Sequence, residues 1–84
     1  MSYKVTIKKN VAKKLRTIPK EYVPKIYSEM KGLSENPRPK NSKKLQGKND
    51  IYRIRVGVYR LLYEIDDTVR IVSVEKLMHR QYGY

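Results

Sequence analysis

The stretch IYRIRVGVYRLLYEIDD, residues 51–67, decides the fold. Apolar or aromatic residues alternate with charged ones along it, and a period of two is typical of a β-strand with one buried face. Gly57 and Val58 stand at its centre, and glycine at the first position of a two-residue loop suits a type II′ turn. The stretch therefore predicts a hairpin with strands near residues 51–56 and 58–65, followed by a turn at Asp66 and Asp67.

The register of this hairpin predicts two different faces. If Val56 pairs with Tyr59, one face is apolar and should meet the core; it carries Tyr52, Ile54, Val56, Tyr59, Leu61, Tyr63 and Ile65. The other face carries Arg53, Arg55, Arg60, Leu62 and Glu64. Arg55 is then directly opposite Arg60, and like charges in that position destabilise a sheet.

Two interpretations of these arginines compete. In the first, Glu64 and nearby carboxylates partly offset them on a solvated face. In the second, they form an anion cradle, because guanidinium groups bind phosphate oxygens in bidentate fashion. We favour the cradle, since 8 acidic residues cannot neutralise 20 basic ones.

The segments around the hairpin predict one further strand before it, two helices and a third strand after it. Tyr3, Val5 and Ile7 alternate as in a half-buried strand. A helix should begin at Asn10 as its N-cap and end before Pro19, and its apolar positions are Val11, Leu15 and Ile18. A second helix should cover residues 21–35 with an apolar stripe of Val23, Ile26, Tyr27, Met30 and Leu33.

Pro24 requires that this second helix either begins near Tyr22 or bends. The stretch ENPRPKNSKKLQGKND, residues 35–50, is expected to form a loop and residues 69–75 a strand, and the tail KLMHRQYGY shows no clear period. The prediction is a single α+β domain over residues 1–84. Its element order is β-α-α-β-β-β, and a two-helix hairpin packs on one face of an antiparallel sheet.

Charge is the strongest feature of the composition. The 84 residues carry a net charge of +12, far more than the magnitude of about 2–8 that solubility requires. Such a charge attracts nucleic acid, an anionic membrane or an acidic protein.

The chain has no cysteine, and neither a metal-ligand spacing nor a phosphate-binding glycine loop occurs, so we expect no metal and no cofactor. No signal peptide or apolar run of membrane-spanning length is seen, so we expect a soluble cytoplasmic protein and no membrane partner.

The C-terminal residues hold further candidates. His79 is the only histidine and is followed by Arg80, Tyr82 and Tyr84. An imidazole, a guanidinium and two phenols can move protons and stabilise charge on a phosphate, and tyrosines can stack on the bases of single-stranded RNA. The alternative is a frayed end.

Residues that would bind RNA outside the hairpin are Lys13, Lys43, Lys44 and Tyr82. For the lysines of the first helix, the alternative is a solvated face.

The segments YRIRVGVYRLLYEIDD, IPKEYVPKI, LSENPRP, KKLQGKNDIYRIR and HRQYGY together resemble the RelE/ParE toxin superfamily over essentially the whole chain. In RelE-type members the resemblance implies this same fold and a type II toxin–antitoxin system. It also implies metal-independent cleavage of messenger RNA in the ribosomal A site, in which the ribose 2′-hydroxyl attacks its own phosphate and leaves a 2′,3′-cyclic end. The implied partners are a cognate antitoxin, the ribosome and the message, in a toxin–antitoxin hetero-oligomer.

By this resemblance the catalytic positions are Arg53, Arg55, Arg60, Arg80 and Tyr84, with His79 beside them. Arginine does not deprotonate in proteins, so Arg53 and Arg55 should hold phosphate, and proton transfer passes to His79, Tyr84 or Glu64. Gly83 replaces the usual valine, which makes Tyr82 an alternative to Tyr84; we expect Tyr84 to orient a base more than to transfer a proton. ParE-type members share the fold but act on DNA gyrase. A gyrase inhibitor and a non-catalytic RNA-binding module are therefore the alternatives.

Overall fold

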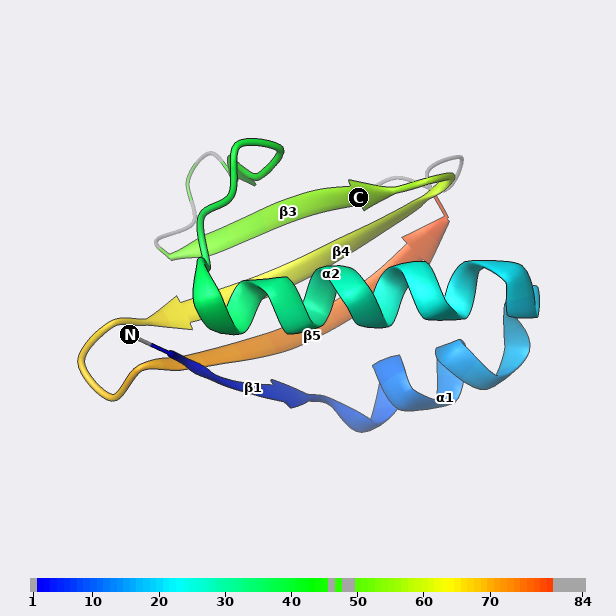
Figure 1. Cartoon of the computed structure of the whole chain (residues 1–84), viewed down its shortest axis with the longest axis horizontal. Helices are drawn as coiled ribbons and strands as arrows, with labels where there is room; N and C mark the ends of the chain where they lie inside the picture. The colour runs from blue at the N-terminus through cyan, green and yellow to red at the C-terminus, as the bar shows by residue number, and fades with distance from the viewer. Residues whose placement is uncertain (1, 46, 48–49, 80–84) are drawn as a thin grey trace.

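The structure is a computed structural model that describes residues 2–45, 47 and 50–79. Its helices are α1 (Lys9–Thr17), the short 3₁₀ helix η1 (Lys20–Tyr22) and α2 (Val23–Glu35). Its strands are β1 (Lys4–Ile7), β2 (Lys43–Lys44), β3 (Ile51–Val56), β4 (Tyr59–Asp66) and β5 (Ile71–His79). They form one sheet in the order β1-β5-β4-β3-β2, with both α-helices over the same face (Figure 1). The fold is α+β in two layers, as the sequence predicts.

The central hairpin has the predicted register. Val56 pairs with Tyr59, Arg55 with Arg60 and Ile54 with Leu61. Gly57 has a φ of 62°, and of the two loop residues it alone lies in the left-handed region, as a type II′ turn requires. The predicted apolar face is therefore the one that packs against the helices, and Ile54, Leu61 and Tyr63 are fully buried there.

The sheet is mixed rather than antiparallel, which corrects one part of the prediction. β1 pairs with β5 in parallel, with Val5 opposite Val72. This pairing joins the two ends of the sequence, and alternation within one strand carries no information about such a distant partner. β2 lies inside the predicted loop and pairs Lys43 with Arg53; a strand of two residues is too short to show a period.

The last strand is also longer than expected, since β5 continues to His79. Leu62 pairs with Lys76, but the next residue, Tyr63, pairs with Val74. Glu75 is thus an extra residue on β5, a β-bulge that shifts the alternation by one position. The bulge explains why the sequence after residue 75 shows no clear period.

Most of the predicted helical core is confirmed. Val11, Leu15, Ile18, Ile26, Met30 and Leu33 are buried. Pro24 lies in the first turn of α2, so the helix begins next to Tyr22 and does not bend there. Three assignments are wrong: Tyr27 is 50% exposed, Ile7 is 37% exposed, and Asn10 lies inside α1, where its side chain donates to the Glu75 carbonyl at 3.0 Å rather than capping the helix.

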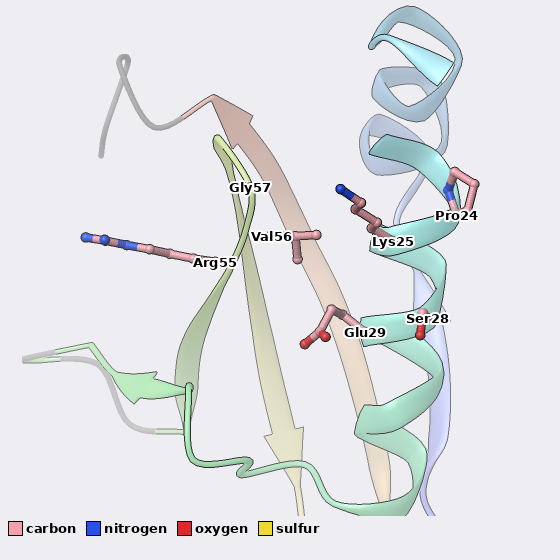
Figure 2. A pocket seen from close by; sticks show the side chains of 7 residues that line it. All are labelled: Pro24, Lys25, Ser28, Glu29, Arg55, Val56 and Gly57. Atoms are coloured by element: carbon pink, nitrogen blue, oxygen red, sulfur yellow. The ribbon is translucent and has the colours of Figure 1, made fainter. Parts of the chain in front are cut away.

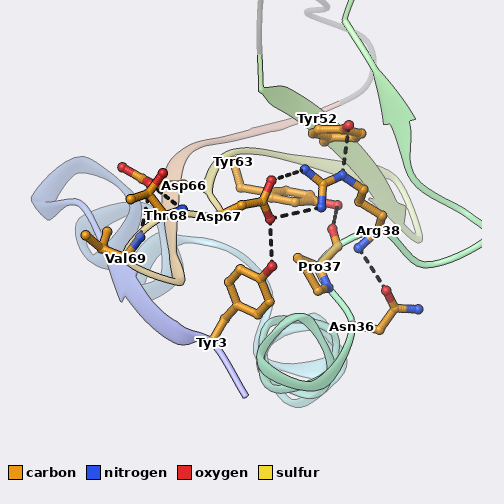
Figure 3. A network of polar contacts seen from close by, with 10 residues as sticks. All are labelled: Tyr3, Asn36, Pro37, Arg38, Tyr52, Tyr63, Asp66, Asp67, Thr68 and Val69. Carbon is orange, nitrogen blue, oxygen red and sulfur yellow. Dashed lines mark hydrogen bonds and ion pairs between the residues drawn. The ribbon is translucent and has the colours of Figure 1, made fainter. Parts of the chain in front are cut away.

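A polar cluster connects segments that are distant in the sequence (Figure 3). The Arg38 guanidinium donates to both carboxylate oxygens of Asp67, at 3.2 and 2.8 Å, and its Nε donates to the Tyr52 hydroxyl at 3.0 Å. The Tyr3 hydroxyl donates to Asp67 at 2.6 Å. We call Tyr3, Arg38, Tyr52 and Asp67 the Arg38 clamp. It holds the start of β1, the segment after α2, β3 and the β4–β5 turn together.

The tyrosine next to the clamp anchors the same segment. The buried Tyr63 hydroxyl donates to the Pro37 carbonyl at 2.8 Å, and its ring stacks on Tyr52 with centroids 6.0 Å apart. Burial raises the pKa of Tyr63 to about 12, so the hydroxyl stays a donor. The chain after α2 is therefore fixed at residues 37 and 38, and it leads directly into β2.

The Arg38 clamp should make the stability of the fold depend on pH. Its hydrogen bonds from Arg38 and Tyr3 lower the pKa of Asp67 from 3.8 to about 2. The carboxylate therefore contributes stability above about pH 4, and that contribution is lost as the pH falls toward about 2. Between about pH 5 and pH 2, the thermal midpoint of the wild type should fall more steeply than that of Asp67→Asn. Circular dichroism melts measure this, with Glu35→Gln, at the exposed end of α2, as a control that keeps the wild-type slope. Equal slopes in wild type and Asp67→Asn would contradict the clamp's role.

Candidate functional site

The face of the sheet away from the helices carries the predicted arginines. Arg53, Leu62 and Lys76 lie side by side across β3, β4 and β5, and Arg55, Arg60 and Met78 form the next row. β2 adds Lys43 opposite Arg53. We call Lys43, Arg53, Arg55, Arg60 and Lys76 the arginine face. Neighbouring strands lie about 4.8 Å apart, so five cationic side chains start from a small area.

Burial separates the members of this face. The Arg55 side chain is exposed, whereas Arg53 and Arg60 are half-buried. Leu62 is only 7% exposed, although it is on this face rather than in the helix-side core. Its neighbours across the strands are Arg53 and Lys76, whose long aliphatic stems can lie over an apolar residue while the charged ends reach solvent.

One hollow lies on the arginine face, next to β2. Asn41, Lys43, Arg53 and Arg55 line it, and its volume is about 220 Å³. Three cations and an amide around one concavity suit an anion with several oxygens, such as a phosphate. The sequence analysis does not name Asn41 or Lys76 as site residues. Asn41 reaches the hollow because the chain forms β2 just after it, and Lys76 reaches the arginine face because of the bulge at Glu75. Neither position can be recognised from the sequence.

A larger hollow of about 480 Å³ lies between α2 and the β3–β4 turn (Figure 2). Lys25 and Glu29 face it from the helix, while the Arg55 side chain points away from α2 toward the arginine face. Lys25 and Glu29 carry opposite charges, so the helix wall of this hollow has no net charge, and Arg55 is the other charged residue that lines it. Size alone therefore does not identify the anion site.

Acidic residues gather at the far end of the sheet. Asp50, Glu64, Asp66 and Asp67 line a hollow of about 290 Å³ near the β4–β5 turn. Glu64 pairs with Ile51, and three residue pairs lie between this pair and the Arg55–Arg60 pair. Ion pairs in the described part of the chain join Lys8 to Glu75 and Arg38 to Asp67, so none of them occupies Arg53 or Arg55. Within the described residues, Glu64 therefore does not offset the charge of Arg53 or Arg55 through an ion pair.

The other predicted site residues lie elsewhere. His79 pairs with Tyr59, so its ring is on the helix side of the sheet, 5.4 Å from the Tyr59 ring at an interplanar angle of 76°. Lys13 is exposed on α1, which also packs on the helix side. Lys44 neighbours Lys43 but pairs with Tyr52 and alternates to the opposite face. Arg80, Tyr82 and Tyr84 lie outside the described residues.

Two further observations concern the described residues. No group of three or more His, Cys, Asp or Glu side chains within them could hold a metal ion. None of their helices is both long and apolar enough to cross a membrane.

Known proteins match this chain over nearly its whole length. The family model described as the ParE toxin of the type II toxin–antitoxin system parDE matches residues 4–83. A Methanocaldococcus jannaschii protein named "Putative toxin RelE1" is 32% identical over 100% of this chain and 97% of its own length. Among solved structures, RelE in the RelE–RelB complex of Pyrococcus horikoshii has a TM-score of 0.86 and 32% identity over 95% of this chain and 97% of that one. The RelBE2 toxin–antitoxin complex of Mycobacterium tuberculosis gives 0.81 and 26%, over 95% of this chain and 100% of that one.

The chain therefore belongs to the RelE/ParE superfamily of type II toxin–antitoxin toxins. Its fold and its relatives agree on the RelE-like form. The arginine face is the part of this fold whose chemistry is unusual for a sheet surface.

Replacing Arg55 by glutamine should stabilise the free protein at low salt. Arg55 lies directly opposite Arg60, and removing a like-charge pair of this kind is worth about 0.2–1 kcal/mol. The gain should shrink at high salt, because the screening length falls from about 30 Å at 0.01 M to about 3 Å at 1 M. Urea unfolding at both salt concentrations measures it, and Lys31→Gln, on the exposed side of α2, is the matched control. An Arg55→Gln protein less stable than wild type at low salt would show that the arginine pair is not repulsive.

Proposed function

We propose that this toxin is a ribosome-dependent, metal-independent endoribonuclease that cleaves messenger RNA and inhibits translation. The observation that carries the proposal is the arginine face: Arg53, Arg55 and Arg60 come together on one exposed sheet surface beside a cation-lined hollow. Guanidinium groups at this spacing suit the oxygens of a phosphodiester.

The proposed reaction forms one bond and breaks another at the same phosphorus. The ribose 2′-oxygen attacks the adjacent phosphate, the P–O5′ bond breaks, and the products are a 2′,3′-cyclic phosphate and a free 5′-hydroxyl. One proton leaves the 2′-hydroxyl and one is delivered to the O5′ leaving group. Negative charge grows on the non-bridging oxygens, where Arg53, Arg55 and Arg60 can stabilise it. We assign Arg80 to the same charge or to the leaving oxygen, on the resemblance alone.

The proton transfers need a group other than these arginines. Glu64 lies toward the Ile51 end of the hairpin and His79 packs on the helix side, so both start away from the Arg55–Arg60 pair. We therefore give His79 a supporting position and leave proton transfer to the tail that contains Tyr84 or to groups of the bound ribosome. Tyr84, or Tyr82 in its place, would orient the substrate base by stacking.

The partners follow from the same surface. Several of the structural relatives are toxin–antitoxin complexes, among them RelE–RelB and RelBE2, and we propose that this chain likewise forms a hetero-oligomer with a cognate antitoxin. An antitoxin segment carrying Asp or Glu would offset the charge of the arginine face, either by covering the hairpin or by displacing the HRQYGY tail. The free toxin would act in the cytoplasm, at the ribosomal A site and on the message there.

A gyrase inhibitor is the second candidate, because the matching family model carries the ParE name. A non-catalytic RNA-binding module is the third. Induced expression followed by mapping of message 5′ ends separates all three. Cuts confined to translated messages support the ribonuclease, a DNA-damage response without cuts supports the gyrase inhibitor, and neither response supports a binding module.

Single substitutions on the basic set should remove most of the activity. Arg60→Ala and Arg80→Ala should each reduce cleavage of ribosome-bound message about tenfold to hundredfold, because a charge-assisted hydrogen bond is worth about 1.5–3 kcal/mol. The measurement is the rate of cleavage on purified programmed ribosomes at equal amounts of folded protein. Lys31→Ala, on the exposed side of α2, is the control and should cleave at the wild-type rate. Full activity in both arginine variants would rule out this assignment of the site.

Binding to RNA should depend strongly on salt. If 6–10 phosphates are engaged, affinity should fall by roughly 10³–10⁵ between 50 and 200 mM salt, because bound counterions are released. Fluorescence anisotropy of a labelled RNA measures the slope. Arg55→Gln should reduce the slope of log affinity against log salt concentration by about one unit, because one phosphate contact is lost. Lys31→Gln should leave the slope unchanged. A slope near zero in the wild type would mean that the charge of +12 serves another purpose.

A further inference from the structure

Tyr22 lies beneath the β3–β4 turn, on the helix side of the sheet. It is the last residue of η1, and its ring meets the Tyr59 ring edge-on, with centroids 5.2 Å apart and an interplanar angle of 73°. Tyr59 in turn meets His79 edge-on. The three rings form a row under the end of the hairpin that bears Arg55 and Arg60 on its opposite face.

The same ring also touches the turn itself. A Cβ atom added to Gly57 would lie 2.9 Å from Tyr22 Cε1 and 3.3 Å from Cδ1, closer than carbon atoms approach without displacement. Glycine is therefore required here twice, for its left-handed φ of 62° and for the close approach of the tyrosine. Tyr22 thus contacts both the turn and the first residue of β4.

Support at this point matters because, among the described residues, a neighbouring strand borders the hairpin end on its β4 side but not on its β3 side. β5 borders only the β4 side, through the Tyr59–His79 pair. On the outer edge of β3, β2 reaches Arg53 but no strand of the described residues pairs with Arg55 or Val56. The opposed charges of Arg55 and Arg60 push this end apart.

We propose that Tyr22 is a positioning residue of the arginine face, which it fixes through the turn without touching the substrate. Its ring holds Gly57 and Tyr59, and these set the separation and direction of the Arg55 and Arg60 side chains. Arg53 is independent of Tyr22, because β2 supports it directly. The inference rests on the proposed ribonuclease function only where cleavage is measured.

The test compares Tyr22→Ala, Tyr22→Leu and Tyr22→Phe with Tyr27→Ala. Tyr27 is the matched control, a tyrosine of α2 that is 50% exposed. Nε–Hε NMR signals of the arginines report their positions, thermal melts report stability, and cleavage on programmed ribosomes gives kcat and KM separately. In Tyr22→Leu, and in Tyr22→Ala if it folds, the Arg55 and Arg60 signals should shift or broaden while Arg53 stays unchanged. We expect kcat to fall at least tenfold with little change in KM.

Tyr22→Phe keeps the ring and should behave as wild type, as should Tyr27→Ala. Unchanged Arg55 and Arg60 signals in a folded Tyr22→Leu protein would overturn the inference. A loss of signal at all three arginines that follows the loss of stability would overturn it as well, because Tyr22 would then be an ordinary core residue. If the wild-type protein cleaves nothing and the Arg55 and Arg60 signals still respond as expected, the proposed function fails and the positioning role stands.

Discussion

The register of the β3–β4 hairpin is the constraint on which the other features depend. A two-residue turn at Gly57 leaves only one way to pair the strands, and it sends Ile54, Leu61 and Tyr63 to the core and Arg53, Arg55 and Arg60 to the open face. A slip of one residue would exchange the two sets completely. The buried set makes such a slip costly, at about 1.5–3 kcal/mol for each large side chain exposed. The core therefore enforces the crowding of charge on the other face.

The crowding of like charges destabilises the sheet, and it is confined to the end of the hairpin that carries Arg55 and Arg60. Acidic residues that could have offset the arginines are gathered at the β4–β5 turn, where Asp67 is bonded to Arg38 instead. The end of the sheet at the β4–β5 turn thus holds the Arg38–Asp67 ion pair, whereas the end at the β3–β4 turn holds the opposed arginines Arg55 and Arg60. A surface arranged in this way is less stable alone than in complex with an anion, since a bound phosphate converts repulsion into shared attraction.

The sequence predicts what alternation and turn chemistry determine locally. The hairpin, its faces, the three grouped arginines and the apolar stripe of α2 except for Tyr27 follow from residue spacing alone. Three features could not be predicted, and each depends on a distant contact: the parallel β1–β5 pairing, the two-residue strand β2 and the bulge at Glu75. Asn10 belongs to the same group, because its amide bonds a carbonyl of β5. At the site, the sequence therefore names Lys43 as an RNA-binding candidate but does not predict its position opposite Arg53.

His79 shows why grouping in sequence and grouping in space have to be kept apart. It precedes Arg80 directly in the chain, and a histidine there invites a catalytic role. Strand alternation settles where its ring goes, because pairing with Tyr59 commits it to the side of the sheet that faces the helices. From that side it can influence the arginine face only through the residues it packs against, in the same way as Tyr22. Two aromatic contacts then meet at Tyr59, one from Tyr22 in the helical layer and one from His79 on β5, so the end of the hairpin is restrained from the helix side of the sheet.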